Sequence, residues 1–463
     1  MKLTLSAVIV LWLSLMTSSA HADDISVPVY RVEIMTPGGA LPFIMFGDVE
    51  GSIFGEVGTP SEFKSFLVIK NGEERIPVRK KPEHTTREKF GTEDRDRRDI
   101  LGRFTRRTRI TQVVPFDAYG SVLQWSHWSG HDLQEEPIQR YEGAWKKQRG
   151  DKVYELPVIV TQVGRDGDKY TAARFEPMPS GYGLDADVEV DFSGRWRVEF
   201  ESSDEPAIGV FEVDENQLAT GTFLTTTGDY RFLEGRVDGP YLRLSTFDGA
   251  HAFLFHAEMQ GDGSIKGDFW SGNWHHEKWT AVRDDDATLP DAFEQTTIAD
   301  EQALADAVFK DIYGNPTRVL DALDETNAKA RVLEIFGTWC PNCSDAGREL
   351  VSLKEKYGDD LGIVGLAFEV TEDFERSSQQ VQRHHEHIGS DWEVLIAGLS
   401  DKAKATETLG FLDKVRSYPT LIFLNERNEV QAVYSGFSGP ATGEAYTSQR
   451  ERFEALIEGL IGE

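Results

Sequence analysis

The chain has 463 residues, which is enough for two or three domains with substantial cores. Its formal net charge of −30 speaks against general binding to nucleic acids or to anionic membranes, because those surfaces are negatively charged as well. The chain contains only two cysteines, so a structural zinc site would need further ligands at motif spacing, and the sequence does not offer them.

Residues 1–22 have the pattern of a secretory signal peptide. Lys2 supplies the positive end, residues 5–16 are mostly apolar, and Ala20-His21-Ala22 matches the small-x-small cleavage pattern. The apolar run is shorter than the roughly 18 residues that a transmembrane helix needs, and no later segment is long and apolar enough. We therefore expect a mature protein that begins near Asp23, resides in the periplasm and does not span the membrane.

The next part of the chain predicts antiparallel β-structure throughout. Residues 186–285 are expected to form a β-meander, because turns such as Thr227-Gly228-Asp229 and Gly261-Asp262-Gly263 separate short runs rich in aromatic residues, valine and threonine. Such a meander removes its exposed edges by closing into a barrel or a sandwich.

Residues 23–185 are expected to form a first β region. Tyr141-Glu142-Gly143-Ala144-Trp145 is similar to Ile265-Lys266-Gly267-Asp268-Phe269-Trp270, which makes a duplicated unit one interpretation. Residues 75–109 carry many arginines interleaved with acidic residues. This segment is interpreted either as a solvated loop with internal ion pairs or as a patch for an anionic partner.

Residues 286–463 alternate strand and helix patterns and therefore predict an α/β domain. A polar linker, residues 284–290, leads into it, and a first helix is expected over residues 301–309. The expected strands are residues 332–336, 363–368, 394–396, 421–424 and 430–434, and the expected helices are residues 343–357, 372–387, 401–410 and 450–461.

The motif Trp339-Cys340-Pro341-Asn342-Cys343 lies between the first of these strands and the following helix. This position places both sulfur atoms in the first helical turn, where free backbone N–H groups and the helix dipole stabilise a thiolate. We expect Cys340 to be the exposed residue at the helix cap and Pro341 to occupy the first helical position. A zinc site and an inert structural disulfide are the alternatives to a redox dithiol.

This strand–motif–helix unit resembles the thioredoxin superfamily, and specifically the TlpA/ResA-like thiol–disulfide oxidoreductases, over about residues 290–463. Tyr418-Pro419-Thr420, which opens the apolar run 421–424, resembles the cis-proline segment of that family. The resemblance implies a thioredoxin-like fold in which Pro419 lies against the dithiol. It also implies that Trp339, Pro341, Tyr418 and Thr420 contact the substrate, and that Cys340 attacks a disulfide while Cys343 resolves the mixed disulfide.

Two acidic residues are candidates to assist the exchange. Glu334 lies six residues before Cys340, where the superfamily often keeps a buried acid that accepts the proton of the resolving thiol; an outward-facing strand glutamate is the alternative. Glu369 follows a buried strand at the carboxyl edge of the sheet, where α/β proteins place their sites. The family often carries a glutamate three residues after the second cysteine, but here that position is Ala346, preceded by Asp345.

Two histidine clusters, His384-His385-Glu386-His387 and His275-His276, permit a metal hypothesis. Neither comes with a third set of ligands at suitable spacing, so we predict no metal and no cofactor. The leading hypothesis is a periplasmic thiol–disulfide oxidoreductase, with the reductase direction taken from the resemblance. Its partners would be disulfide-containing substrate proteins and a membrane-embedded electron donor. The alternatives are an envelope binding protein, or a copper-delivery protein that uses both sulfurs and the His384 cluster.

Overall fold

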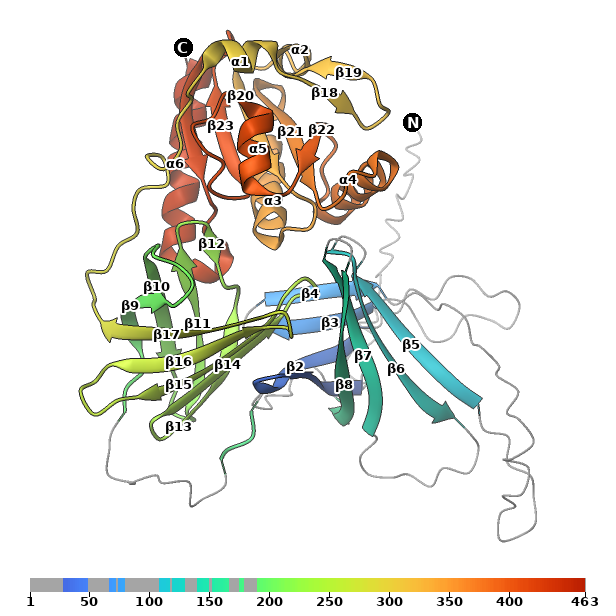
Figure 1. Cartoon of the computed structure of the whole chain (residues 1–463), viewed down its shortest axis with the longest axis vertical. Helices are drawn as coiled ribbons and strands as arrows, with labels where there is room; N and C mark the ends of the chain where they lie inside the picture. The colour runs from blue at the N-terminus through green and yellow to red at the C-terminus, as the bar shows by residue number, and fades with distance from the viewer. Residues whose placement is uncertain are drawn as a thin grey trace, which may run out of the picture.

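The computed structural model contains two β units and an α/β domain (Figure 1). It describes residues 28–48, 66–71, 74–79, 108–116, 119–129, 140–149, 152–165, 175–178 and 190–462. The expected signal peptide, residues 1–22, lies outside the described residues, as does most of the basic segment, residues 80–107. No helix in the described part of the chain is long and apolar enough to cross a membrane.

The first unit is an eight-stranded antiparallel sheet with the order β4-β3-β2-β1-β8-β7-β6-β5. The strands are β1 (Pro28–Thr36), β2 (Gly39–Asp48), β3 (Phe66–Asn71), β4 (Glu74–Arg79), β5 (Thr108–Phe116), β6 (Ser121–Ser129), β7 (Arg140–Arg149) and β8 (Lys152–Arg165). Its core contains Phe43, Leu123 and Trp145, and it continues into the second unit through Phe247 and Leu254. This cluster therefore joins the two β units, while the barrel interior has a separate core.

The second unit is a closed antiparallel barrel. Its strands are β9 (Gly194–Phe200), β10 (Ala207–Val213), β11 (Leu218–Thr225), β12 (Gly228–Asp229), β13 (Leu233–Asp238), β14 (Tyr241–Phe247), β15 (Ala252–Met259), β16 (Ile265–Ser271) and β17 (His275–Arg283). The sheet order β10-β9-β17-β16-β15-β14-β13-β11 closes because β10 also pairs with β11, and the short β12 pairs only with β11. The predicted closed meander is thus confirmed as a barrel.

Residues along the barrel strands alternate between facing inward and facing outward, and many of the inward-facing side chains are aromatic. In β17, Glu277, Trp279 and Ala281 are buried while their neighbours are exposed or partly exposed, as expected for a strand with one face inside. Phe223 and Phe255 stack with their ring centroids 4.6 Å apart at the centre. The interior is therefore a packed core, and a cavity opens at one end of the barrel.

The two β units have related strand orders. In both, successive strands pair as a meander and the last long strand pairs with the first, β8 with β1 and β17 with β9. In the first unit β4 and β5 are the two edge strands of the sheet. The first unit therefore has the strand order of the barrel but, in the described part of the chain, without the pairing that would close it between β4 and β5. Duplication of one unit remains a prediction that this similarity supports.

The third unit is an α/β domain around a seven-stranded sheet with the order β19-β18-β22-β21-β20-β23-β24. Its strands are β18 (Val308–Asp311), β19 (Pro316–Arg318), β20 (Ala330–Phe336), β21 (Leu361–Glu369), β22 (Glu393–Leu399), β23 (Thr420–Leu424) and β24 (Val430–Ser435). Its helices are α1 (Glu301–Asp306), α2 (Val319–Glu325), α3 (Pro341–Tyr357), α4 (Phe374–Ile388), α5 (Lys402–Leu409) and α6 (Glu444–Gly462), with short 3-10 turns at Gly358–Asp360 and Pro440–Thr442. The helix expected over residues 301–309 ends at Asp306, and Phe309 lies in β18 instead.

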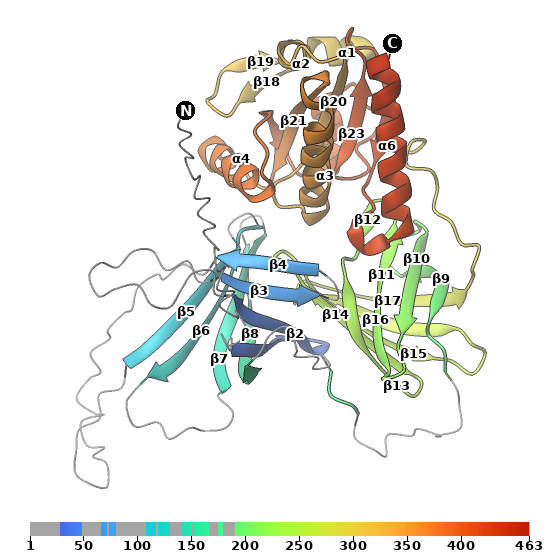
Figure 2. The same cartoon turned by 180° about the vertical axis from the view of Figure 1, so that it is seen from behind.

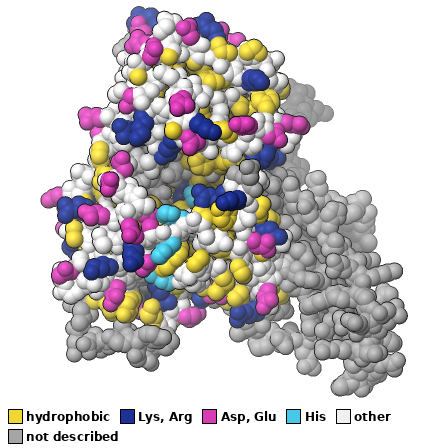
Figure 3. All heavy atoms as spheres, viewed as in Figure 1, with side chains coloured by type: hydrophobic (Ala, Val, Ile, Leu, Met, Phe, Trp, Pro, Cys, Tyr) yellow, Lys and Arg dark blue, Asp and Glu magenta, His cyan; other side chains and the backbone are white. Residues whose placement is uncertain are grey.

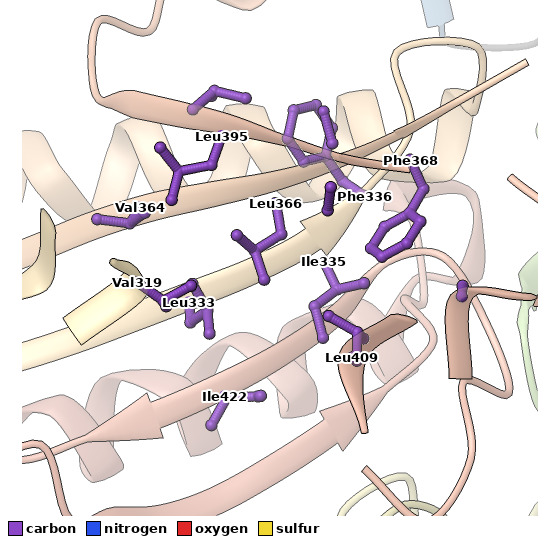
Figure 4. Packing of buried hydrophobic residues seen from close by; sticks show 14 of the residues in the cluster. Val319, Leu333, Ile335, Phe336, Val364, Leu366, Phe368, Leu395, Leu409 and Ile422 are labelled. Atoms are coloured by element: carbon purple, nitrogen blue, oxygen red, sulfur yellow. The ribbon is translucent and has the colours of Figure 1, made fainter. Parts of the chain in front are cut away.

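Strand β20 is central and buried along its whole length, so its side chains pack on both faces of the sheet. Leu333 and Ile335 point to the face covered by α2 and α5, where they meet Leu366 and Leu409 (Figure 4). Helices α3 and α6 cover the opposite face (Figure 2). Parallel β20, β21 and β22 with antiparallel β23 and β24 give this domain a thioredoxin-like topology, with the carboxyl end of β20 directed at the two β units.

Candidate active site

The two cysteines lie at the start of helix α3, directly after β20. Cys340 is the N-cap residue, and its sulfur accepts a hydrogen bond from the backbone N–H of Cys343 at 3.2 Å. Pro341 occupies the first helical turn, where a missing N–H leaves no intrahelical hydrogen bond unmade. Both cysteines are present as free thiols. The pKa of Cys343 is raised well above its ordinary value, mainly because the thiol is buried and secondly because Cys340 lies beside it.

Cys340 is less exposed than the sequence predicts. Only 7% of it is accessible, because its sulfur lies against the loop that precedes β23 and within a cluster of buried side chains. The Cys340 thiol donates to the Tyr418 carbonyl oxygen at 3.5 Å. The expectation of an exposed sulfur at the helix cap is therefore wrong: the cap position is as predicted, but the facing loop covers the atom.

The loop that faces the dithiol is Ser417-Tyr418-Pro419-Thr420. The Tyr418–Pro419 peptide bond is cis. The Ser417 hydroxyl donates to the Pro419 carbonyl at 3.1 Å, and the Thr420 hydroxyl donates to the Ser417 carbonyl at 3.0 Å, so the loop is held by its own side chains. The Trp339 ring packs edge-on against Tyr418 with centroids 5.6 Å apart. The structure thus brings Trp339, Cys340, Tyr418 and Pro419 together, while Thr420 is buried in β23.

Glu334 is buried in the middle of β20. It is only 1% exposed, and its Oε1 atom has no hydrogen-bond partner among the described residues. The outward-facing alternative is therefore wrong. Burial raises the pKa of Glu334 to about 8, and its charge also contributes to the raised pKa of Cys343. A buried carboxyl that is protonated at neutral pH and senses the state of Cys343 can hold a proton for the resolving thiol.

Glu369, at the end of β21, holds the loop that leads to Cys340. It accepts hydrogen bonds from the Thr338 backbone N–H at 3.0 Å and from the Thr338 hydroxyl at 2.9 Å. The indole N–H of Trp339 donates to the Phe368 carbonyl at 2.9 Å, which ties the same loop to the same strand. Burial raises the pKa of Glu369 to about 7. Glu369 thus accepts both hydrogen bonds from Thr338, and it thereby fixes the position of the loop that precedes Cys340.

Asp345 has a partner that the sequence did not reveal. It lies two residues beyond Cys343 on α3 and forms a buried ion pair with Arg231 of the barrel. Arg231 also lies 3.4 Å from Asp248, and Asp345 lies 3.2 Å from Arg348. This network fixes the barrel against the active-site helix. The departure from the family pattern at Ala346 and Asp345 thus coincides with an interdomain contact.

A cavity of about 690 Å³ lies between the end of the barrel and the motif residues Trp339 and Asn342. Trp339 and Asn342 line it from the α/β domain, while Tyr230, Phe269 and His275 are among the barrel residues that line it. The face shown in Figure 3 is hollowed between the α/β domain and the barrel, and histidine side chains gather there. The motif therefore faces a partly open cavity that the barrel end helps to form.

The histidine clusters do not converge on the sulfur atoms. His384 packs 5.2 Å from the Phe336 ring, and burial lowers the pKa of His384 to about 3. His275 and His276 point to opposite faces of β17 and pair with Glu277 and Asp268, each at 2.8 Å. Within the part of the chain that the structure describes, no three histidine, cysteine or acidic side chains are grouped as metal ligands.

The topology and the site together define a thioredoxin-like domain with a dithiol at its active-site position. Over 143 residues, the chain is 25% identical to the thioredoxin-like protein YneN of Bacillus subtilis, a match that covers 31% of this chain and 75% of that protein. No family model matches the chain.

Three solved structures are each similar to about a third of the chain. A secreted disulfide oxidoreductase of Mycobacterium tuberculosis is 14% identical, with 35% of this chain and 99% of that chain covered and a TM-score of 0.25. A DsbF homologue of Corynebacterium diphtheriae is 18% identical, with 36% and 93% covered and a TM-score of 0.26. The exposed lipoprotein thioredoxin Etrx1 of Streptococcus pneumoniae is 21% identical, with 31% and 97% covered and a TM-score of 0.21.

Proposed function

We propose that the protein is a thiol–disulfide oxidoreductase that works in the periplasm through Cys340 and Cys343. The observation that carries this proposal is the geometry of Cys340. Its sulfur lies at the cap of α3, accepts a backbone N–H and faces the Tyr418–Pro419 peptide. A helix cap stabilises a thiolate, and a second thiol in the next turn can displace whatever the first has bound.

The exchange proceeds in two displacements. The Cys340 thiolate attacks one sulfur of the substrate disulfide, a mixed disulfide forms, and the other substrate sulfur leaves as a thiolate. Cys343 then loses its proton and attacks the Cys340 sulfur, so that the second substrate thiol leaves and a Cys340–Cys343 disulfide remains. Two electrons pass from the protein to the substrate.

Glu334 is the proton acceptor in the second step. Cys343 is fully buried, so its thiol cannot give its proton directly to water, and Glu334 is a buried carboxyl whose charge bears on it. With a pKa of about 8, Glu334 is mostly protonated at neutral pH, and its ionised fraction, about one in ten at pH 7, takes the proton as Cys343 attacks. Its raised pKa brings it close to the operating pH, which suits an acid–base group.

The net direction is reduction of the substrate. After each turnover in this direction the protein is oxidised and needs two electrons to return to the dithiol. We assign the supply of these electrons to a membrane-embedded thiol donor. The expected signal peptide, residues 1–22, supports a location where such a donor and disulfide substrates meet. Substrate proteins are the partners that the family resemblance implies.

The test is a trapping experiment with the full mature chain. In Cys343→Ser the first displacement occurs but the second does not, so the reduced variant should form a stable adduct with hydroxyethyl disulfide that is visible as an added half-disulfide mass. The matched control, Cys340→Ser, should form much less adduct because its remaining thiol is buried and has a raised pKa. Equal labelling of the two variants, or of neither, would contradict the proposed roles.

A further inference from the structure

Two cavities meet at the active-site tryptophan. The larger, of about 690 Å³, lies at the barrel end, and a second, of about 520 Å³, lies between the first sheet and the α/β domain. The residues common to both linings are Lys147, Arg149, Trp274 and Trp339. Trp339 directly precedes Cys340. Two cations and two indole rings therefore form the wall that the cavities share beside the reactive cysteine.

Lys147 is buried at this wall because side chains along β7 alternate between the two faces of the sheet and Lys147 lies on the inward-facing side. It lies two residues beyond the core residue Trp145, on the same face of the strand, and is only 7% exposed. Its ammonium group donates to the Tyr119 carbonyl at 2.8 Å and forms no ion pair with a carboxylate of the described residues. Burial lowers the pKa of Lys147 to about 8. A buried ammonium has three donors, so this one has hydrogen-bonding capacity left for a ligand.

Arg149 follows on the same face of β7. Its guanidinium lies over the Trp274 ring, 5.1 Å from the centroid. In the part of the chain that the structure describes, it has no carboxylate partner at ion-pair distance. In a chain with a net charge of −30, a buried lysine and a nearby arginine that have no carboxylate at ion-pair distance among the described residues are unusual, although the more distant Asp248 acts electrostatically on Lys147.

Three acidic residues line the larger cavity, Glu205, Asp229 and Glu277, and each already accepts a hydrogen bond from the protein; Glu205 accepts one from the Thr226 hydroxyl at 3.4 Å. Glu277 accepts hydrogen bonds from the Ser202 hydroxyl at 2.5 Å and pairs with His275 at 2.8 Å. Asp229 accepts the backbone N–H groups of Arg231 at 2.7 Å and Gly439 at 2.6 Å. The free hydrogen-bonding capacity at the shared wall therefore comes from cations, which fits an anionic ligand.

We propose that this cavity binds a low-molecular-weight disulfide that carries carboxylates, with the carboxylate at Lys147 and Arg149 and the organic chain against Trp274 and Trp339. This inference rests on the proposed thiol–disulfide exchange, and it replaces the substrate proteins that the family resemblance implies with a class of small molecules. A small ligand is favoured because the barrel closes over the motif: the Asn342 side chain lies directly against Gly228, where any β-carbon would collide with it. A cavity of about 690 Å³ is within the range that small ligands occupy.

The bound disulfide would react by the two displacements given above. Cys340 bonds to one ligand sulfur and the other leaves as a thiolate; Cys343 then displaces the second. The ligand gains two electrons and becomes two thiols, while the protein becomes the Cys340–Cys343 disulfide. One turnover of the reduced protein needs no further reductant.

The experiment compares two small disulfides in single-turnover oxidation of the reduced mature protein, followed by alkylation and mass spectrometry. Glutathione disulfide carries carboxylates, and hydroxyethyl disulfide is the neutral control. The rate ratio of the first to the second should fall about tenfold in Arg149→Gln and in Lys147→Gln, because a charge-assisted hydrogen bond is lost. Arg149→Lys should recover part of the ratio. Arg149 is exposed, so its variants keep the inference testable if Lys147→Gln does not fold.

The outcomes separate the two proposals. If neither probe oxidises the dithiol, the proposed function fails. If both probes react and the ratio does not change in the variants, the carboxylate site is wrong and the exchange activity stands. A linear oxidised peptide with glutamate beside its cysteine distinguishes the source of the carboxylate: if it reacts faster than glutathione disulfide and depends more strongly on Arg149, the low-molecular-weight substrate class is overturned in favour of a polypeptide.

Discussion

Arg231 of the barrel and Asp345 of helix α3 form a buried ion pair two residues beyond the resolving cysteine. Both side chains are almost inaccessible, at 6% each. Removing Arg231 leaves the buried Asp345 with only the more exposed Arg348 as an ion-pair partner among the described residues. The pair therefore couples the position of the barrel to the position of the dithiol.

We expect Arg231→Ala to loosen the barrel from the α/β domain. The loss of one partner of a buried ion pair costs about 3–5 kcal/mol, so the interface should open and Cys340 should react faster with iodoacetamide in the reduced protein. The control is Arg318→Ala, which breaks an exposed pair with Asp321. An unchanged alkylation rate in Arg231→Ala would show that the ion pair does not hold the interface closed.

The contact between Gly228 and Asn342 gives a second, independent prediction for the same interface. Gly228→Ala should weaken it, because the added carbon would overlap Asn342 and Gly228 has a φ of 154°, which favours glycine. In an Asn342→Ala background the overlap disappears and only the backbone strain remains. The drop in melting temperature caused by Gly228→Ala should therefore be smaller in that background. Equal drops would mean that the side-chain contact contributes nothing.

Glu334 should make stability depend on pH. Its pKa is raised from 4.5 to about 8 on folding, so between these values the native state binds more protons than the unfolded state and stability falls as the pH rises. The slope reaches at most about 1.4 kcal/mol per pH unit. Denaturant midpoints measured from pH 5 to 8 should decline in the wild type and be flatter in Glu334→Gln. Parallel profiles would contradict the buried, proton-binding state of Glu334.

Glu369 should control the order of the loop before Cys340. Glu369→Ala removes the acceptor of the Thr338 N–H and hydroxyl, which leaves buried donors unpaired at a cost of about 1–3 kcal/mol. Hydrogen exchange of the Thr338–Cys340 amides should become faster. Glu372→Ala, an exposed position three residues on, is the control and should leave that exchange unchanged. If Glu369→Ala leaves the amides protected, other contacts hold the loop.

Sequence patterns predicted the local features well. The strand–motif–helix junction at Cys340 follows from an apolar run, a proline at the first helical position and a periodic helix, all within about 25 residues. The barrel strands follow from alternation and turn residues. The exposure of Cys340 was predicted wrongly because the Tyr418 loop that covers it comes 78 residues later in the chain.

The positions of Lys147 and Arg231 were not predicted from the sequence, for two different reasons. Lys147 occupies a strand position that differs from its neighbours only in facing inward, and Arg231 lies 114 residues from Asp345. A pattern search for inward-facing charged residues on strands could have found Lys147, since it lies two residues after Trp145. No such search could have paired Arg231 with α3.

The sequence by itself determined the dithiol, its helix cap and the antiparallel character of the long region before it, because these depend on neighbours within a few residues. Only the tertiary structure decided that the barrel end lies over the motif, that Asp345 is bound to that barrel, and that two cations line the space beside Trp339. The physical reason is that burial and ion pairing arise between surfaces distant along the chain, and their geometry exists only once the three units pack together.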